Sequence, residues 1–280
     1  MLTAGKYHTL KINRVSTPGL YLADEEGNEV LLPNRFVSME NKVGDEMRVF
    51  VYHDSEDRIV ASTETPYATV GQAAYLKVVD QNAHGAFLDW GIKAKDLFIP
   101  NRNQPFNMEV GKKYVVYVYT DNVTGRAVAT AKQNSFVRND EIAVKEGYGV
   151  DIMIATESAI GYRVVVNDRN WGMLYRNQVF KPVHIGDRMK AYVARVTDDR
   201  RIDVSLQQAG YDEVKKSAER LVELARANGG ALPLSDGSSP ADIYRLTEMS
   251  KKVFKRSAGY LMKHGLAVMP EKELVLTGKE

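Results

Sequence analysis

Residues 161–206 decide the fold, and they read GYRVVVNDRNWGMLYRNQVFKPVHIGDRMKAYVARVTDDRRIDVSL. Short runs rich in Val, Ile and Tyr alternate here with glycine and with Asn/Asp turns, a pattern typical of short strands in an all-β domain. The runs are Tyr162 to Val166, Met173 to Tyr175, Met189 to Val196 and Arg201 to Leu206, and Val150 to Ile154 lies just upstream. Five short strands in so few residues predict a small barrel of the OB type.

The same pattern occurs twice more upstream, so the chain contains an internal repeat. In each copy a glycine is followed by a second glycine 14 residues later and by a third 39 or 40 residues after the first. The three sets are Gly5, Gly19 and Gly44; Gly71, Gly85 and Gly111; and Gly147, Gly161 and Gly186. The first copy has strand-like runs at Tyr7 to Val15, Leu20 to Leu22, Val30 to Leu32, Met47 to Tyr52 and Arg58 to Ser62. The second has them at Ala74 to Val79, Ala86 to Trp90, Leu97 to Ile99, Tyr114 to Tyr119 and Arg126 to Thr130.

The character of the sequence changes after Gln208. Apolar residues at helical spacing predict a helix from Tyr211 to Ala227, and a second helix is expected from Pro240 to about Met249. Ser250 is a favourable N-cap for a third helix that ends before Gly265. Two short runs near the C-terminus, Leu266 to Met269 and Glu273 to Leu276, then predict a hairpin.

The predicted fold is therefore mainly β with an α+β tail: three tandem five-stranded barrels followed by a winged helix-turn-helix. We expect the barrels at 1–66, 67–138 and 139–209, and the winged helix at 210–280. A chain of 280 residues is long enough for several domains, each with its own core.

Composition excludes several classes of protein. The chain has no cysteine, which rules out disulfides, thiolate metal sites and cysteine nucleophiles and fits a reducing compartment. The first ten residues lack the uninterrupted apolar core of a signal peptide, and no stretch approaches the roughly 18 apolar residues of a membrane span. We expect a cytoplasmic protein that does not contact membranes.

The sequence offers no catalytic or metal-binding motif. The five histidines are scattered without metal-ligand spacing, and no glycine-rich phosphate loop is present. A site assembled only by folding stays open as an alternative. We predict no enzymatic activity, no catalytic residues, no metal and no cofactor.

The repeat units resemble the S1 RNA-binding domain. In the third copy the resemblance is carried by Gly161-Tyr162-Arg163-Val164, Gly172-Met173-Leu174-Tyr175, Gly186-Asp187 and the run from Asp199 to Leu206. The second copy carries it in Gly85-Ala86-Phe87-Leu88-Asp89 and Val110-Gly111, and the first mainly in Gly44-Asp45. Three such units ahead of a winged helix resemble the conserved virulence factor B family of bacterial proteins. This resemblance implies RNA binding linked to control of gene expression, without catalysis.

Strand alternation predicts which side chains face outward. In the second strand of each copy, the residues one and three after the glycine suit the core, so Tyr21, Phe87 and Arg163 should stand on the outer face. S1 domains are expected to stack bases on that face, where aromatic rings or guanidinium planes are suitable partners. The alternative for Phe87 and Tyr175 is packing against a neighbouring barrel.

Charge distribution ranks the copies. Residues 1–66 carry 7 Lys/Arg against 11 Asp/Glu, 67–138 carry 9 against 5, 139–209 carry 10 against 10, and 210–280 carry 12 against 10. The acidic first copy is therefore expected to bind RNA least, because it would repel phosphate. The predicted RNA-binding residues of the second copy are Phe87, Lys93, Lys95, Phe98 and Arg102. Those of the third copy are Arg163, Tyr175, Arg176, Arg195, Arg200 and Arg201, and those of the third helix are Lys251, Lys252, Lys255 and Arg256.

Single-stranded RNA is the predicted partner, bound by the second and third barrels and the basic helix. Two alternatives remain. In the first, the chain is a DNA-binding transcriptional regulator whose winged helix reads duplex DNA while the barrels act as spacers. In the second, it is a protein scaffold that uses the acidic first barrel as its partner surface.

Overall fold

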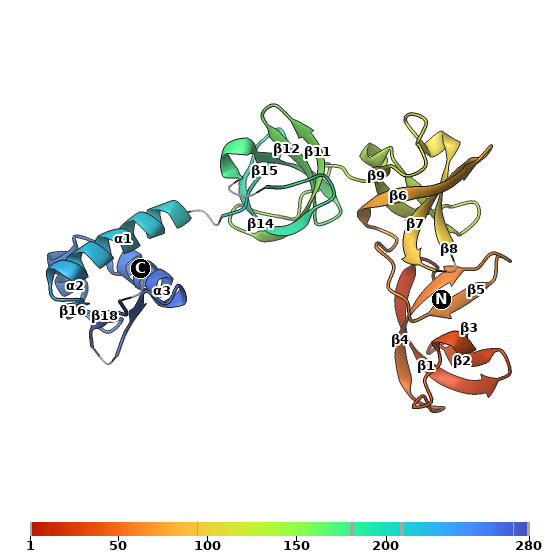
Figure 1. The fold of residues 1–280 in the computed structure, drawn as a ribbon, viewed down its shortest axis with the longest axis horizontal. Helices are drawn as coiled ribbons and strands as arrows, with labels where there is room; N and C mark the ends of the chain where they lie inside the picture. Colours follow the sequence, from red (N-terminus) through yellow and green to blue (C-terminus); the bar gives the residue numbers. More distant parts are fainter. Residues whose placement is uncertain (1, 94, 180–181, 208–209, 271, 279–280) are drawn as a thin grey trace. The chain divides into compact units, whose positions relative to one another are not determined.

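The computed structural model describes residues 2–93, 95–179, 182–207, 210–270 and 272–278. Its contacts divide the chain into two compact units, Met1–Leu206 and Gln207–Glu280. The first unit contains three β-barrel modules, coloured red through green in Figure 1, and the second contains the helices. Each unit is considered separately below.

The strands of the first unit fall where the repeat predicts them. Barrel 1 contains β1 (Lys6–Ser16), β2 (Gly19–Ala23), β3 (Glu29–Pro33), β4 (Glu46–His53) and β5 (Ile59–Ser62). Barrel 2 contains β6 (Ala73–Asn82), β7 (Gly85–Ile92), β8 (Lys95–Pro100), β9 (Lys113–Thr120) and β10 (Ala127–Thr130). Barrel 3 contains β11 (Gly149–Ser158), β12 (Gly161–Val166), β13 (Asn170–Tyr175), β14 (Arg188–Val196) and β15 (Ile202–Ser205). In every barrel a one-residue register shift interrupts the pairing of the first two strands.

The repeated glycines permit close approach of neighbouring strands. A Cβ at Gly19, Gly85 or Gly161 would lie 2.0, 2.3 or 2.3 Å from a carbonyl oxygen of the third strand, which no side chain can tolerate. The third glycine of each set donates its N–H to the first strand over 2.8 Å, with Ile12, Val78 and Ile154 as the acceptors. The glycine spacing in the sequence therefore records the same backbone geometry three times.

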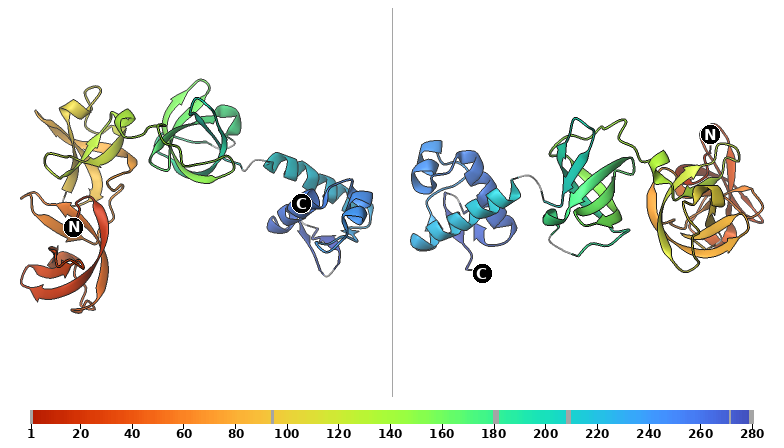
Figure 2. Two further views of the ribbon diagram at one scale, coloured as in Figure 1. Left: turned by 180° about the vertical axis from the view of Figure 1, so that it is seen from behind. Right: turned by 90° about the horizontal axis from the view of Figure 1, so that it is seen from above.

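Barrels 1 and 3 are closed, with strand orders β1-β2-β3-β5-β4 and β11-β12-β13-β15-β14. Barrel 3 is the green module in both views of Figure 2. Barrel 2 has the order β10-β9-β6-β7-β8, and its described strands form no ladder between β8 and β10. Asn103, just past β8, spans this seam instead: its side-chain amide donates to the Ala129 carbonyl over 3.0 Å, and its carbonyl accepts the Ala131 N–H over 3.0 Å.

Inward-facing apolar residues form the cores, and two cores extend across module boundaries. Phe50 and Tyr52 of β4 are buried in the cluster that fills barrel 2, where Phe50 meets Trp90 edge-on at 5.3 Å between ring centroids. A second cluster joins Ala73 and Tyr117 of barrel 2 to Met153 of barrel 3. The barrels of the first unit therefore pack directly against one another.

The second unit contains α1 (Tyr211–Ala227), α2 (Pro240–Thr247) and α3 (Lys251–Lys263), with a small sheet of β16 (Ala231–Leu232), β18 (Leu274–Leu276) and β17 (Ala267–Val268) in that order. The Ser250 hydroxyl accepts the Val253 N–H and caps α3, as predicted. The helix α2 ends two residues earlier than expected because Glu248 adopts a left-handed conformation with a φ of 59°. Phe254 and Leu261 of α3 pack with Leu221 of α1 in a separate core.

The predicted fold class is confirmed: three five-stranded barrels precede a three-helix unit with a terminal hairpin. The strand β16 was not predicted, because two residues carry no periodic signal. The four-domain division at 66/67, 138/139 and 209/210 stays a prediction. The last of these boundaries lies next to residues 208–209, which are outside the described residues.

Candidate nucleic-acid interface

The second and third strands pair in the same register in all three barrels, so the outward residues at equivalent positions can be compared. In barrel 2, Phe87 of β7 pairs with Phe98 of β8, and the two rings lie 5.2 Å apart between centroids. The corresponding pair is Tyr21 and Leu31 in barrel 1 and Arg163 and Met173 in barrel 3. An aromatic pair at this site is therefore a feature of barrel 2.

Strand alternation correctly predicted the inward and outward faces. The residues one and three after the conserved-spacing glycine are buried in every copy: Leu20 and Leu22, Ala86 and Leu88, and Tyr162 and Val164. Phe87 and Phe98 are half-buried, and Arg163 is exposed. The outward side chains therefore reach the surface of the barrel.

In barrels 1 and 3 the outward side chain already has an intramolecular stacking partner. The Arg14 guanidinium lies 3.7 Å from the centre of the Tyr21 ring and pairs with Glu29 at 2.7 Å. In barrel 3 the Arg163 guanidinium lies 3.6 Å from the centre of the Trp171 ring. Arg163 also donates over 3.0 Å to the side chain of Asn134, which precedes barrel 3. One face of each guanidinium is thus occupied within the protein.

Phe87 and Phe98 line a pocket, and of the predicted cations of barrel 2, Lys95 is among its lining residues whereas Lys93 and Arg102 are not. Lys93 is exposed, whereas Lys95 is half-buried and donates over 3.2 Å to the carbonyl oxygen of Asp54 in barrel 1. Burial lowers the pKa of Lys95, and the nearby Arg126 guanidinium lowers it further. Arg102 is exposed and pairs with the buried carboxylate of Asp121 at 2.8 Å.

A carboxyl group also lies at this site. Asp96 of β8 lines the same pocket as Phe87 and Phe98. Burial raises the pKa of Asp96, and the neighbouring carboxylates of Asp89 and Asp80 add to the shift. The pocket therefore combines aromatic rings with both cations and a carboxyl group.

The arginines of barrel 3 are largely paired with carboxylates of the same barrel. Arg176 pairs with Glu157 at 2.9 Å, Arg195 with Asp203 at 2.8 Å, and Arg201 with Asp199 at 2.8 Å. Arg200 donates over 2.9 Å to the carbonyl oxygen of Asp140. This local pairing explains how a module with many arginines has a balanced charge. Tyr175, at the end of β13, is half-buried and lies opposite Gly161.

The predicted basic residues of α3 lie at the N-terminal half of that helix. Lys252, Lys255 and Arg256 are exposed, and Lys251 donates over 2.8 Å to the Ser238 carbonyl oxygen. Lys255 lies 3.9 Å from the Asp236 carboxylate. The opposite side of the helix, with Phe254, Ala258 and Leu261, is buried.

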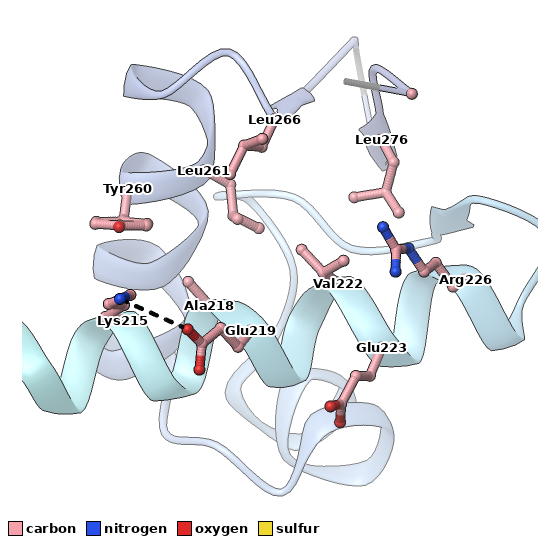
Figure 3. Close-up of a pocket in the computed structure, with 11 residues that line it drawn as sticks. Lys215, Ala218, Glu219, Val222, Glu223, Arg226, Tyr260, Leu261, Leu266 and Leu276 are labelled. Atoms are coloured by element: carbon pink, nitrogen blue, oxygen red, sulfur yellow. Dashed lines mark ion pairs between the residues drawn. The ribbon is translucent and has the colours of Figure 1, made fainter. Parts of the chain in front are cut away.

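The second unit also has an apolar pocket of about 660 Å³, shown in Figure 3. Val222 of α1, Leu261 of α3 and Leu276 of β18 contribute to its walls, and an ion pair of 4.0 Å joins Lys215 to Glu219 at its edge. The predicted lysines of α3 are not among its lining residues.

Sequence reasoning missed two residues at the aromatic pair. His53, the last residue of β4 in barrel 1, and Arg126, just before β10, line the pocket that contains Phe87 and Phe98. No local pattern could have identified His53, because only the packing of barrel 1 on barrel 2 brings it to this site.

No group of three or more His, Asp or Glu side chains is placed to hold a metal ion in the part of the chain that the structure covers. Within the same residues, no helix combines the length and the apolar character needed to cross a bilayer.

Models of two domain families match the first two barrels and the second unit. The S1 domain model matches residues 4–64 and 70–132, so it includes the first copy, whose motifs are the weakest in the sequence. A model described as the CvfB-like winged helix domain matches residues 219–276.

Relatives match along almost the whole chain. An uncharacterized protein of Bacillus subtilis strain 168, YitL, is 28% identical over 273 residues, which cover 93% of this chain and 89% of that protein. The conserved virulence factor B of Staphylococcus saprophyticus is 22% identical over 275 residues, covering 92% of this chain and 89% of that protein. A crystal structure from Streptococcus pneumoniae TIGR4, described as a multidomain protein with nucleic acid binding domains, shares 20% identity; the match covers 98% of both chains with a TM-score of 0.41.

Tandem S1 barrels followed by a winged helix define a nucleic-acid-binding protein. The order of these modules, together with the relatives that match along almost the whole chain, identifies the family. The chain belongs to the conserved virulence factor B family.

Proposed function

We propose that the chain binds single-stranded RNA, with barrel 2 as the principal contact, and that it acts in the control of gene expression without catalysing a reaction. The observation that carries the proposal is the Phe87–Phe98 pair on the outer face of barrel 2. Two aromatic rings that reach the surface provide a platform on which unpaired bases can stack. In the other two barrels an arginine and an aromatic ring already stack on each other.

Positive charge on barrel 2 supports the same proposal, because Lys95 and Arg126 line the pocket of the aromatic pair. Lys93, Lys95 and Arg102 belong to the copy with the largest excess of cations, so they would attract the phosphates that follow a stacked base. We assign Arg163, Tyr175, Arg176, Arg195, Arg200 and Arg201 to a secondary contact on barrel 3. Most of these arginines would have to exchange an internal partner for a phosphate.

The winged helix would add a contact of low sequence selectivity. Lys251, Lys252, Lys255 and Arg256 place their charges on one helix, and lysine ammonium groups favour phosphates over base edges. The contribution of α3 should therefore depend strongly on salt.

Replacing Phe87 with alanine tests the proposal directly. One stacked base is worth about 1–3 kcal/mol, so Phe87→Ala should weaken binding of a labelled single-stranded RNA 12-mer by roughly 5- to 150-fold. Tyr21→Ala is the matched control, because Tyr21 occupies the equivalent position but is covered by Arg14; it should change the affinity less than about two-fold. Fluorescence anisotropy measures both, and circular dichroism checks that each variant is folded.

The same titrations with duplex DNA distinguish the proposed RNA binding from the main alternative, a DNA-binding transcriptional regulator. A DNA-binding regulator would bind the duplex more tightly than the RNA, lose that binding when the α3 lysines are neutralised, and be insensitive to Phe87→Ala. Unchanged RNA affinity in Phe87→Ala would overturn the proposal.

A further inference from the structure

A pocket of about 280 Å³ lies where barrel 1 meets barrel 2. Barrel 2 contributes Phe87, Phe98 and Lys95 to its wall, and barrel 1 contributes His53. The pocket is smaller than typical drug-sized sites, which begin at about 300 Å³. Its scale and its aromatic wall suit a single flat heterocycle.

The wall contributed by barrel 1 contains a polar atom without a partner. His53 Nδ1 is buried, and no hydrogen-bond partner for it exists among the described residues. Leaving a buried polar atom unpaired is unfavourable, so such an atom requires an explanation, of which a ligand is one. An imidazole nitrogen can donate or accept, depending on its tautomer, which matches the mixed edge of a nucleobase.

Two cations that line the pocket also hold the junction together. The Lys95 ammonium group donates to the Asp54 carbonyl oxygen over 3.2 Å, and Arg126 pairs with Asp57 of barrel 1 at 2.5 Å. These two contacts fix barrel 1 on barrel 2 and so keep His53 in the wall of the pocket. The acidic first barrel therefore contributes structure and one polar atom to the site, although its net charge opposes RNA.

We propose that this junction pocket binds one unstacked nucleobase of the RNA, with its face against Phe87 and Phe98, and that the His53 imidazole, whose Nδ1 is buried in the unbound chain, turns to meet a polar edge of that base. The proposal rests on the proposed function for the identity of the polymer. It goes beyond that function by making barrel 1 a part of the site, so that two modules read one nucleotide.

Two substitutions of His53 test the proposal with opposite expectations. His53→Phe keeps a ring of similar shape but removes the polar atom, and it should weaken binding of the single-stranded RNA 12-mer about two- to twelve-fold. It should not lower the melting temperature, because it removes a buried atom that has no partner within the folded protein. His53→Asn restores a polar atom near the position of Nδ1 and should bind RNA within about two-fold of the wild type. His8→Phe is the control, since His8 is also in barrel 1 but bonds to Thr3 outside the pocket.

A second measurement tests whether the pocket binds a nucleotide in the absence of RNA. The full chain is titrated with AMP, GMP, CMP and UMP while the imidazole C–H resonances of its five histidines are followed by NMR, with His53 assigned from the His53→Asn variant. At least one nucleotide should shift the His53 resonance, whereas ribose 5-phosphate should not. If the wild type binds RNA and Phe87→Ala weakens it, but His53→Phe and the nucleotides have no effect, the pocket proposal is wrong and the proposed function stands. If the RNA 12-mer does not bind at all, the proposed function fails, and a shift of His53 by nucleotides would still support the pocket.

Discussion

Asp121 shows how one buried carboxylate fixes the turn between β9 and β10. One of its oxygens accepts the N–H groups of Thr124 and Val123, each over 3.0 Å, and the other accepts the Arg102 guanidinium over 2.8 Å. The hydrogen bond from the Thr124 N–H is the largest cause that lowers the pKa of Asp121 below its ordinary value of 3.8. Arg102, a predicted RNA contact, therefore also has a structural role.

Asp121→Ala should reduce the free energy of unfolding at pH 7 by about 1–3 kcal/mol, because the Val123 and Thr124 amides and the Arg102 guanidinium lose a charged acceptor. The folded carboxyl has the lower pKa, so its stabilising effect is complete above pH 3.8 and is lost as the pH falls through the folded value. The difference between wild type and variant should accordingly shrink below about pH 3.8 in urea titrations. Asp96→Asn provides the opposite sign: the pKa of Asp96 is raised, so removing its charge at pH 7 should leave stability unchanged or increase it. A pH-independent loss in Asp121→Ala would contradict this account.

Among the elements, α3 has its structural contacts on one side and its exposed basic side chains on the other. Its buried side packs against α1, and its N-cap is satisfied by Ser250, so neutralising its exposed lysines should not unfold it. Lys252 and Lys255 are suitable for a test because both side chains are exposed.

The double variant Lys252→Gln/Lys255→Gln should reduce the salt dependence of RNA binding. Each phosphate contact with a single strand contributes about 0.7 to the slope of log affinity against log salt, so the slope should fall by about 1.4 if both lysines touch phosphates. Affinities at three salt concentrations give the slope. The double variant Lys215→Gln/Lys216→Gln removes the same charge from α1 and should leave the slope nearly unchanged. If both double variants lower the slope equally, α3 does not contact the RNA.

The strands themselves were largely predictable, whereas their closure was not. Every predicted strand of the barrels is present, because Val-, Ile- and Tyr-rich runs between glycines specify strands locally. The open seam between β8 and β10 depends instead on Asn103, whose bonds reach Ala129 and Ala131 across the fold. No short stretch of the sequence contains Asn103 together with Ala129 or Ala131.

At the scale of the first unit, a polar contact joins barrel 2 to barrel 3. The Asp168 carboxylate accepts the backbone N–H of Ala73 over 3.0 Å and pairs with Arg188 at 2.9 Å. The same arginine donates to the Ala73 carbonyl oxygen. Three residues from distant parts of the chain therefore fix the start of β6 against barrel 3.

Asp168→Ala should accelerate hydrogen exchange at the Ala73 amide by about 10- to 150-fold, because that amide loses a charge-assisted acceptor. Native-state exchange followed by NMR measures the rate. Asp151→Ala is the control, since Asp151 forms an exposed ion pair with Lys190 within barrel 3 and should not change exchange at Ala73. An unchanged Ala73 rate in Asp168→Ala would show that this contact does not fix β6.

The sequence by itself determined the threefold repeat, the strand and helix positions, and the outward direction of Phe87. These follow from glycine spacing and from strand alternation, which are properties of neighbouring residues. Only the tertiary structure decided which outward groups are already engaged: Arg163 lies on Trp171, Arg195 pairs with Asp203, and His53 lines a pocket with the aromatic pair of another barrel. The physical reason is that strand register sets which side chains meet across neighbouring strands, and the packing of one barrel on the next joins residues of different modules; local periodicity carries no information about either kind of contact.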